Sequence, residues 1–117
     1  EELRGAIGNR VFGCDDCQDV CPWNRRAPYA TDSAFQPKPG LFWPEIGRLL
    51  DMSEDDLRLS IRGTAMKRAK VKGLLRNLMV VAGNSGVRDF LPKLRRFLTH
   101  DDEHVRSHAE WAIRKLE

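Results

Sequence analysis

The stretch KRAKVKGLLRNLMVVAGNSG, from Lys67 to Gly86, decides the fold class of this chain. Its apolar residues recur three and four positions apart, which is the spacing of one face of an α-helix. They form one wide stripe: Val71, Leu74, Leu75, Leu78, Met79 and Ala82. The stretch closes with Gly83-Asn84-Ser85-Gly86, whose residue types terminate helices. The pattern therefore predicts a long amphipathic helix ended by this run.

The sequence on both sides continues the helical periodicity. Before it, a short helix near residue 46 is followed by a second helix capped by Ser53 and stopped by Gly63. After it, VRDFLPKLRRFLTH predicts a helix with Pro92 in its first turn, where the missing N–H costs little. The last stretch, DDEHVRSHAEWAIRKLE, predicts a helix capped by Asp101 or Asp102. Helices joined by short connections predict a mainly α protein with a HEAT-like helical repeat module.

Composition divides the chain into three stretches and indicates the class of protein to which it belongs. We expect a partial ferredoxin-like segment over residues 1–25, a proline-rich connector over 26–44 and the helical module over 45–117. The 117 residues, 41% hydrophobic and 32% charged, are typical of a globular protein and not of a membrane protein. Three clustered cysteines in an otherwise cysteine-free chain indicate a cytoplasmic protein, which we expect to be a monomer. The chain opens with neither a signal peptide nor a Met, so we expect a fragment or trimmed form of a longer protein.

Three cysteines lie close together in FGCDDCQDVCPWN, and the chain has no others. Cys14, Cys17 and Cys21 follow the spacing C-x2-C-x3-C-P, which matches the last three cysteines and the proline of the bacterial ferredoxin run. In two-cluster proteins the cysteine before the proline ligates the other cluster. The spacing thus predicts that Cys14 and Cys17 serve one [4Fe–4S] cluster and Cys21 a second, with the remaining ligands outside this chain.

Other interpretations of these residues stay open. The cysteines could be ordinary buried residues or half of a zinc site, although C-x3-C-P is not a usual zinc knuckle and no His follows nearby. His104 and His108 have the i, i+4 spacing of a metal pair but lack the Glu of H-E-x-x-H, which favours surface or packing roles. Trp23 and Trp111 are expected to pack, Trp23 beside a cluster and Trp111 in the core.

The motif IGNRVFGCDDCQDVCPWNRRA resembles the second cluster motif of the epoxyqueuosine reductase family. The opening EELRGAIGNR, the basic stretch IRGTAMKRAKVKGLLRN, and VVAGNSG and VRSHAEWAIRKL resemble segments that precede and follow this motif in the family. The resemblance covers essentially the whole chain. It implies that these 117 residues correspond to the C-terminal portion of such an enzyme.

This resemblance implies an activity and a set of cofactors. The family reduces the epoxide of epoxyqueuosine to an alkene in the tRNA anticodon, using cobalamin and two [4Fe–4S] clusters. Its cobalamin domain and acidic proton donor would lie in upstream domains, so no residue of this chain is expected to be the catalytic acid. Asp15 and Asp16, between two cluster ligands, would lie near cobalamin; alternatively they simply favour a turn. The electron donor is not indicated.

A basic segment follows the connector. From Leu57 to Arg88 there is no Asp or Glu, and the same stretch holds eight Lys and Arg residues. Such a segment is typical of a polyanion site, although a solvated helix face is the common alternative. Phosphate contacts would supply affinity and salt dependence, not sequence reading. We expect the tRNA anticodon stem-loop to contact residues of the 58–76 segment: Arg62, Lys67, Arg68, Lys70, Lys72 and Arg76.

The leading hypothesis is therefore that this chain is one part of a redox enzyme and is inactive as an isolated fragment. The alternative is a non-catalytic α-helical module that binds RNA or protein and whose cysteines hold zinc or no metal. A third possibility is another cobalamin and iron–sulfur reductase, such as a relative of the reductive dehalogenases. The basic segment disfavours that third idea, because a small-molecule reductase does not need a polyanion site.

Overall fold

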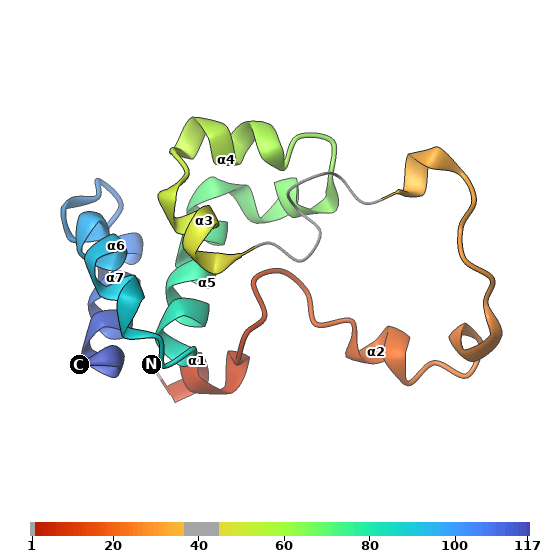
Figure 1. Cartoon of the computed structure of the whole chain (residues 1–117), viewed down its shortest axis with the longest axis horizontal. Coiled ribbons are helices and arrows are strands. Elements are labelled where there is room, and N and C mark those ends of the chain that lie inside the picture. The colour runs from red at the N-terminus through yellow and green to blue at the C-terminus, as the bar shows by residue number, and fades with distance from the viewer. Residues whose placement is uncertain (1, 37–44) are drawn as a thin grey trace.

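The computed structural model describes residues 2–36 and 45–117, and every regular element in these ranges is a helix (Figure 1). The α-helices are α1 (Glu2–Ile7), α2 (Asp16–Asp19), α3 (Ile46–Asp51), α4 (Glu54–Ser60), α5 (Lys70–Asn84), α6 (Leu91–Arg95) and α7 (Glu103–Leu116). Short 3-10 helices are η1 (Asn24–Arg26), η2 (Ser33–Phe35), η3 (Ala65–Ala69), η4 (Arg88–Phe90) and η5 (Arg96–Thr99). The mainly α prediction is confirmed, whereas the HEAT-like repeat remains a prediction. Pro37, Pro39 and Pro44 of the expected connector lie outside the described residues.

Helix α5 is the centre of the core. Its predicted apolar stripe is buried, and α7 packs along it while α1, α3 and α4 contact other parts of its surface. One hydrophobic cluster joins these helices: Leu49, Leu50, Leu57, Ile61, Val71, Leu74, Leu75, Leu78, Met79, Ala82, Leu94, Val105, Ala109, Ala112, Ile113 and Leu116. Burying this apolar surface is the main force that holds the helices together.

Gly83 has a different role from the predicted one. Helix α5 continues through Gly83 to Asn84, and the chain turns away only at Gly86, whose φ of 71° is the left-handed conformation that favours glycine. A Cβ atom added at Gly83 would lie 2.8 Å from Cζ3 of Trp111 and 2.9 Å from Cα of Ala112. Gly83 therefore lets α7 approach α5 closely. Trp111 flanks the core and is half-buried, rather than filling it.

The predicted helix over residues 87–98 is divided into η4, α6 and η5. Pro92 lies in the first turn of α6, as predicted. The proline supplies no N–H to the preceding turn, and the residues before α6 form a 3-10 turn in which Phe90 N donates to Val87 O at 3.3 Å. Val87 and Leu98, apolar residues near the two ends of this stretch, are 42% and 37% exposed.

Two predicted helix caps are present. The Ser53 hydroxyl accepts a hydrogen bond from Asp56 N at 3.1 Å, which caps α4. The Asp102 carboxylate accepts from His104 N at 3.0 Å and Val105 N at 3.2 Å, which caps α7. The sequence predicted either Asp101 or Asp102 as the N-cap, and in the structure the cap is Asp102.

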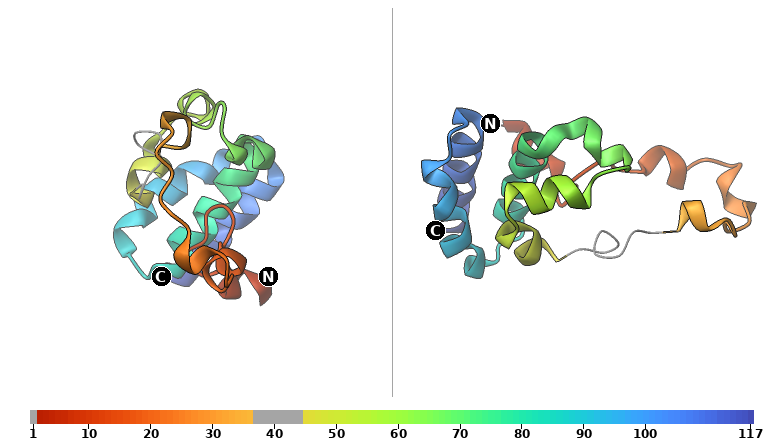
Figure 2. Two further views of the ribbon diagram at one scale, coloured as in Figure 1. Left: turned by 90° about the vertical axis from the view of Figure 1, so that its right-hand side faces the viewer. Right: turned by 90° about the horizontal axis from the view of Figure 1, so that it is seen from above.

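The cysteine segment leaves the helical body as an arm. Residues 12–36 run out with α2 and lie to the right of the body in Figure 1, and the view from above in Figure 2 shows the same separation. The radius of gyration is accordingly 15.7 Å, compared with about 13 Å for a compact domain of roughly 100 residues. Trp23 and Tyr29 in the arm are 88% and 98% exposed, so Trp23 does not pack within the described residues. Across the described ranges no helix has the length and apolar character to cross a bilayer.

Two glycines of α5 provide a matched test of the close helix contact. Gly83→Ala should lower the free energy of unfolding by about 1–3 kcal/mol, because its Cβ has no space against α7. Gly73→Ala should leave it unchanged or raise it by up to about 1 kcal/mol, because the nearest atom to its Cβ would be 3.6 Å away. Urea unfolding of both variants checks this. Equal effects at the two positions would contradict the close approach at Gly83.

Candidate metal centre and nucleic-acid interface

Two asparagines of α5 hold the chain that leads into the arm. Asn84 Nδ2 donates to the carbonyl oxygens of Arg4 and Gly8, both at 2.9 Å, and its Oδ1 accepts from Lys115 Nζ at 2.6 Å. Seven residues earlier, Asn77 Nδ2 donates to Val11 O at 2.7 Å. The i, i+7 spacing places both side chains on one face of the helix. The segment that leads into the arm is therefore held against the core through its backbone carbonyl groups.

The cysteine turn has a defined backbone. Gly13 and Asp15 have φ values of 67° and 54°, a left-handed conformation that glycine adopts freely and aspartate tolerates better than most residues. Asp15 O accepts from Gln18 N at 2.7 Å and Asp19 N at 2.9 Å, which starts α2. Arg10 Nη2 donates to both carboxylate oxygens of Asp16, at 3.2 and 3.1 Å. The Asp15 side chain makes no capping bond.

The three thiols are accessible. Cys14 and Cys17 are exposed, Cys21 is half-buried, and all three are free. Within residues 2–36 and 45–117 no three His, Cys, Asp or Glu side chains are grouped so that they could hold a metal ion. Iron–sulfur clusters of the ferredoxin type take four thiolates. The three thiols of this chain have the donor chemistry of such a cluster. A complete ligand set would need further cysteines that this chain does not contain.

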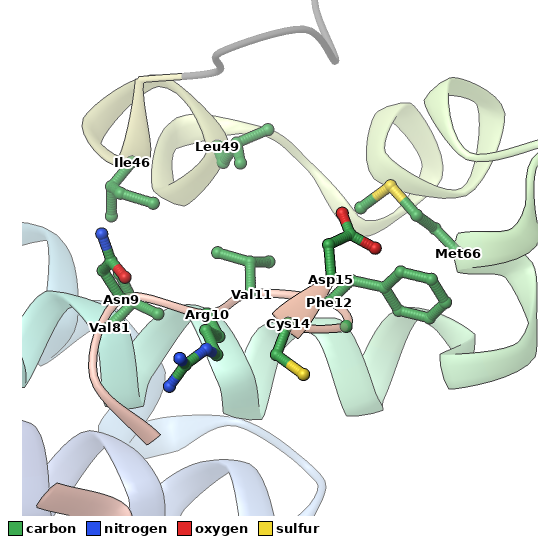
Figure 3. Close-up of a pocket in the computed structure, with 11 residues that line it drawn as sticks. Asn9, Arg10, Val11, Phe12, Cys14, Asp15, Ile46, Leu49, Met66 and Val81 are labelled. Atoms are coloured by element: carbon green, nitrogen blue, oxygen red, sulfur yellow. The ribbon is translucent and has the colours of Figure 1, made fainter. Parts of the chain in front are cut away.

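A pocket of about 600 Å³ lies between the base of the arm and the helical body (Figure 3). Val11, Ile46 and Leu49 contribute apolar surface to it. The Asp15 carboxylate projects on the side of α3 and Met66, and the Cys14 sulfur projects to the other side of the chain (Figure 3). Asp15 and Asp16, treated together in the sequence, are thus separated: one faces the pocket and the other pairs with Arg10.

The basic residues fall into two groups. Side chains of α4, η3 and the start of α5 surround a pocket of about 440 Å³, lined by Arg58, Leu59, Ile61, Arg62, Lys67, Lys70 and Val71. Three of the six expected tRNA contacts, Arg62, Lys67 and Lys70, meet there. Arg68 is exposed but does not line the pocket. In the part of the chain that the structure describes, the side chains of Lys67, Arg68 and Lys70 have no ion-pair partner.

The two remaining basic candidates are engaged with α7 or lie beside it. Lys72 Nζ lies 3.1 Å from Asp102 Oδ2, and its hydrogen bond holds the pKa of Asp102 below its usual range. Arg76 is half-buried and lies near His108. The pKa of His108 is lowered, mainly by burial and in part by the positive charges of Arg4 and Arg76. Lys72 is therefore exposed but paired and Arg76 is partly covered, whereas Lys67, Arg68 and Lys70 are exposed and have no ion-pair partner among the described residues.

His104 and His108 interact through the backbone. The His108 ring Nδ1 lies 2.6 Å from the carbonyl oxygen of His104, so that nitrogen donates along the helix. The contact uses the backbone of His104 and not its imidazole. This arrangement fits the expected surface or packing roles, which remain predictions.

Lys70 has a strained backbone. Its φ of 56° and ψ of 164° belong to a region that is essentially restricted to glycine. The residue joins η3 to α5 and lines the basic pocket, so the turn that places its ammonium group is energetically unfavourable. A Lys in this position gives no local sequence signal. Asn77 and Asn84, in contrast, could have been recognised as two amides seven residues apart in a largely apolar helix.

Curated relatives match nearly the whole chain. It is 44% identical over 115 residues to the epoxyqueuosine reductase of Pseudomonas aeruginosa and 37% identical over 115 residues to that of Escherichia coli, covering 97% of this chain in each case. It spans 32% and 30% of those two proteins, or about a third of their length. No family model matches the chain. The resemblance indicated by the cysteine motif is confirmed, and the coverage is consistent with the predicted C-terminal portion.

Solved structures agree with the sequence relatives. A crystal structure of epoxyqueuosine reductase with an epoxyqueuosine-modified stem loop of tRNA-Tyr has a TM-score of 0.88 at 28% identity, over 99% of this chain and 31% of that one. A structure of epoxyqueuosine reductase from Bacillus subtilis has a TM-score of 0.86 at 29% identity, over 99% of this chain and 32% of that one. The described fold is therefore that of one part of these enzymes.

Two substitutions at Lys70 separate backbone strain from charge. Lys70→Gly should raise the free energy of unfolding by about 1 kcal/mol relative to Lys70→Ala, because glycine adopts the observed φ and ψ without strain. Both variants lose the same positive charge, so the comparison cancels electrostatics. Urea unfolding at one salt concentration measures the difference. A Gly variant less stable than the Ala variant would contradict the strained conformation.

Proposed function

We propose that this chain is the C-terminal part of an epoxyqueuosine reductase, an oxidoreductase that reduces epoxyqueuosine to queuosine in tRNA. The observation that carries the proposal is the match of 44% identity over 97% of the chain, together with the exposed cysteine arm. We place the protein in the cytoplasm as a monomer. Its three parts are the cluster segment 1–25, the connector 26–44 and the HEAT-like module 45–117.

The cysteines supply part of the ligand set for two [4Fe–4S] clusters. Cys14 and Cys17 bind one cluster and Cys21, before the proline, binds the other. Accessible thiols on an arm held at its base by Asn77 suit clusters completed by upstream domains. When bound, the clusters supply electrons to the cobalamin of the full-length protein. The role of this chain is to hold the thiolates in position.

Asp15 is the better candidate of the two acidic residues for a place near cobalamin. Its carboxylate lines the pocket beside the arm, whereas the carboxylate of Asp16 accepts both hydrogen bonds from Arg10. The Arg10–Asp16 pair instead fixes the turn between Cys14 and Cys17. The catalytic acid and the main cobalamin contacts belong to the upstream domains.

The basic segment binds the phosphate backbone of the anticodon stem-loop. Lys67, Arg68 and Lys70 are exposed and unpaired within the described residues, and Arg62 joins two of them at the basic pocket. Lys72 and Arg76 contribute less, because Lys72 pairs with Asp102 and Arg76 is half-buried. A related reductase with 28% identity has been crystallised with a modified tRNA stem loop, which supports RNA as the polyanion.

The second candidate function is a non-catalytic helical module that binds RNA or protein. One observation favours it: the basic pocket, with four cationic side chains and no carboxylate in its lining, would suit an RNA-binding module as well as a reductase. It does not account for the cysteine spacing or for the match to reductases along the whole chain.

The proposed function is tested in the full-length protein with the double variant Lys67→Glu/Arg68→Glu. The native protein should convert epoxyqueuosine to queuosine in tRNA. The variant should raise KM for tRNA at least tenfold with little change in kcat, because it removes ground-state binding. The slope of log Kd against log salt should fall by roughly 1.5, since each lost phosphate contact contributes about 0.7–0.9.

Arg95→Glu is the matched control, because Arg95 is an exposed basic residue outside the basic segment. It should leave KM and the salt slope nearly unchanged. No conversion by the native protein would contradict the reductase assignment. Normal KM and salt slope in the double variant would contradict the RNA-binding role of the segment.

A further inference from the structure

The basic pocket has a polar rim and an apolar floor. Its volume of about 440 Å³ falls within the roughly 300–1,000 Å³ typical of ligand pockets. Ile61 and Val71 line it and are only 3% and 6% exposed, so they form part of the floor. Leu59 also lines it and is 65% exposed. A leucine this exposed, among cations, gives the pocket an apolar wall that solvated lysines and arginines do not require.

The lining carries positive charge and no carboxylate. Lys67 and Lys70 project from η3 and the start of α5, while Arg58 and Arg62 come from α4 and the turn after it. Arg58 pairs with Asp55, which lies outside the lining. Lysine ammonium groups bind phosphate as point charges, and the low local dielectric of a pocket strengthens the attraction. The charge therefore selects an anionic ligand.

The combination of charge and apolar surface narrows the class of ligand. An inorganic phosphate would use the ammonium groups but leave the exposed apolar surface of Leu59 in contact with water. A ribose attached to a phosphate uses both surfaces, because the sugar presents C–H groups beside its phosphate. The lining contains no aromatic side chain on which a base could stack. The pocket thus suits the sugar–phosphate backbone of a nucleic acid.

We propose that this pocket binds one ribose–phosphate unit of the tRNA stem-loop, with the phosphate on Lys67 and Lys70 and the sugar against Leu59. The proposal rests on the proposed function, because it takes tRNA as the polyanion. It adds a defined binding site within the basic segment, where the sequence indicates only a diffuse charged surface. The strained conformation of Lys70 supports it, since such strain is concentrated at functional sites.

Leu59→Ala tests the pocket without changing charge. In the full-length protein, Kd for an unmodified anticodon stem-loop RNA should rise about fivefold, because the sugar loses its apolar partner. The slope of log Kd against log salt should stay the same, since no phosphate contact is removed. Leu3→Ala is the matched control: Leu3 is 78% exposed on α1 and lies outside the pocket, so its Kd should not change.

Lys70→Gly completes the design, because glycine suits the backbone there and removes one cation. Its Kd should rise and its salt slope should fall by about 0.7–0.9. Circular dichroism of all variants confirms that they are folded. If Leu59→Ala binds the RNA like the native protein while Lys67→Glu/Arg68→Glu binds it weakly, the pocket does not bind the ribose–phosphate unit. The RNA-binding role of the basic segment would then still hold. If both bind like the native protein, the pocket and the RNA-binding role are both wrong.

Discussion

The close packing of α7 against α5 at Gly83 is the constraint on which the rest of this structure depends. A side chain at that position would overlap Trp111 and the backbone of Ala112, so the two longest helices can meet only because Gly83 has none. The next residue, Asn84, donates a hydrogen bond to the Arg4 carbonyl oxygen in α1 and accepts one from Lys115 in α7. The α5 helix then links the two candidate sites. Asn77 holds the base of the cysteine arm, and Lys70 at the N-terminal end lines the basic pocket.

Intramolecular pairing divides the basic segment into structural and available charges. Asp102 caps α7 and pairs with Lys72, so one acidic side chain stabilises a helix end and joins it to α5. The pair is partly exposed, and its contribution to stability is correspondingly small. Its main consequence is that it occupies Lys72, whereas the exposed Lys67, Arg68 and Lys70 have no ion-pair partner among the described residues. The distribution of partners, and not the number of charges, identifies the candidate interface.

Helical periodicity predicted most of the fold because the core positions of α4, α5 and α7 lie on regular stripes. Caps at Ser53 and Asp102 were predictable for the same reason, since their signals are local. Gly83 was misinterpreted because a glycine that ends a helix and a glycine that admits a neighbouring helix look alike in sequence. The left-handed backbone of Lys70 and the pocket it lines depend on how α4 meets η3, which no local pattern encodes.

The cysteine arm shows a second limit of sequence reasoning. Spacing predicted the chemistry of the thiols, whereas the contacts of Asn77 and Asn84 that hold the chain just before the arm were not indicated by the sequence. Its large exposed side chains, such as Trp23 and Tyr29, have no partner among the described residues.

Iron and acid-labile sulfide content of the full-length protein, purified without oxygen, tests the central claim most directly. We expect about eight iron atoms per chain, as two four-iron clusters. Cys21→Ala and Cys14→Ala should each lose about four iron atoms, and their double variant all eight, since we assign the two cysteines to different clusters. Loss of the same four iron atoms in both single variants and in the double variant would contradict the split ligation. Stoichiometric zinc without iron would contradict the reductase assignment and favour the binding module.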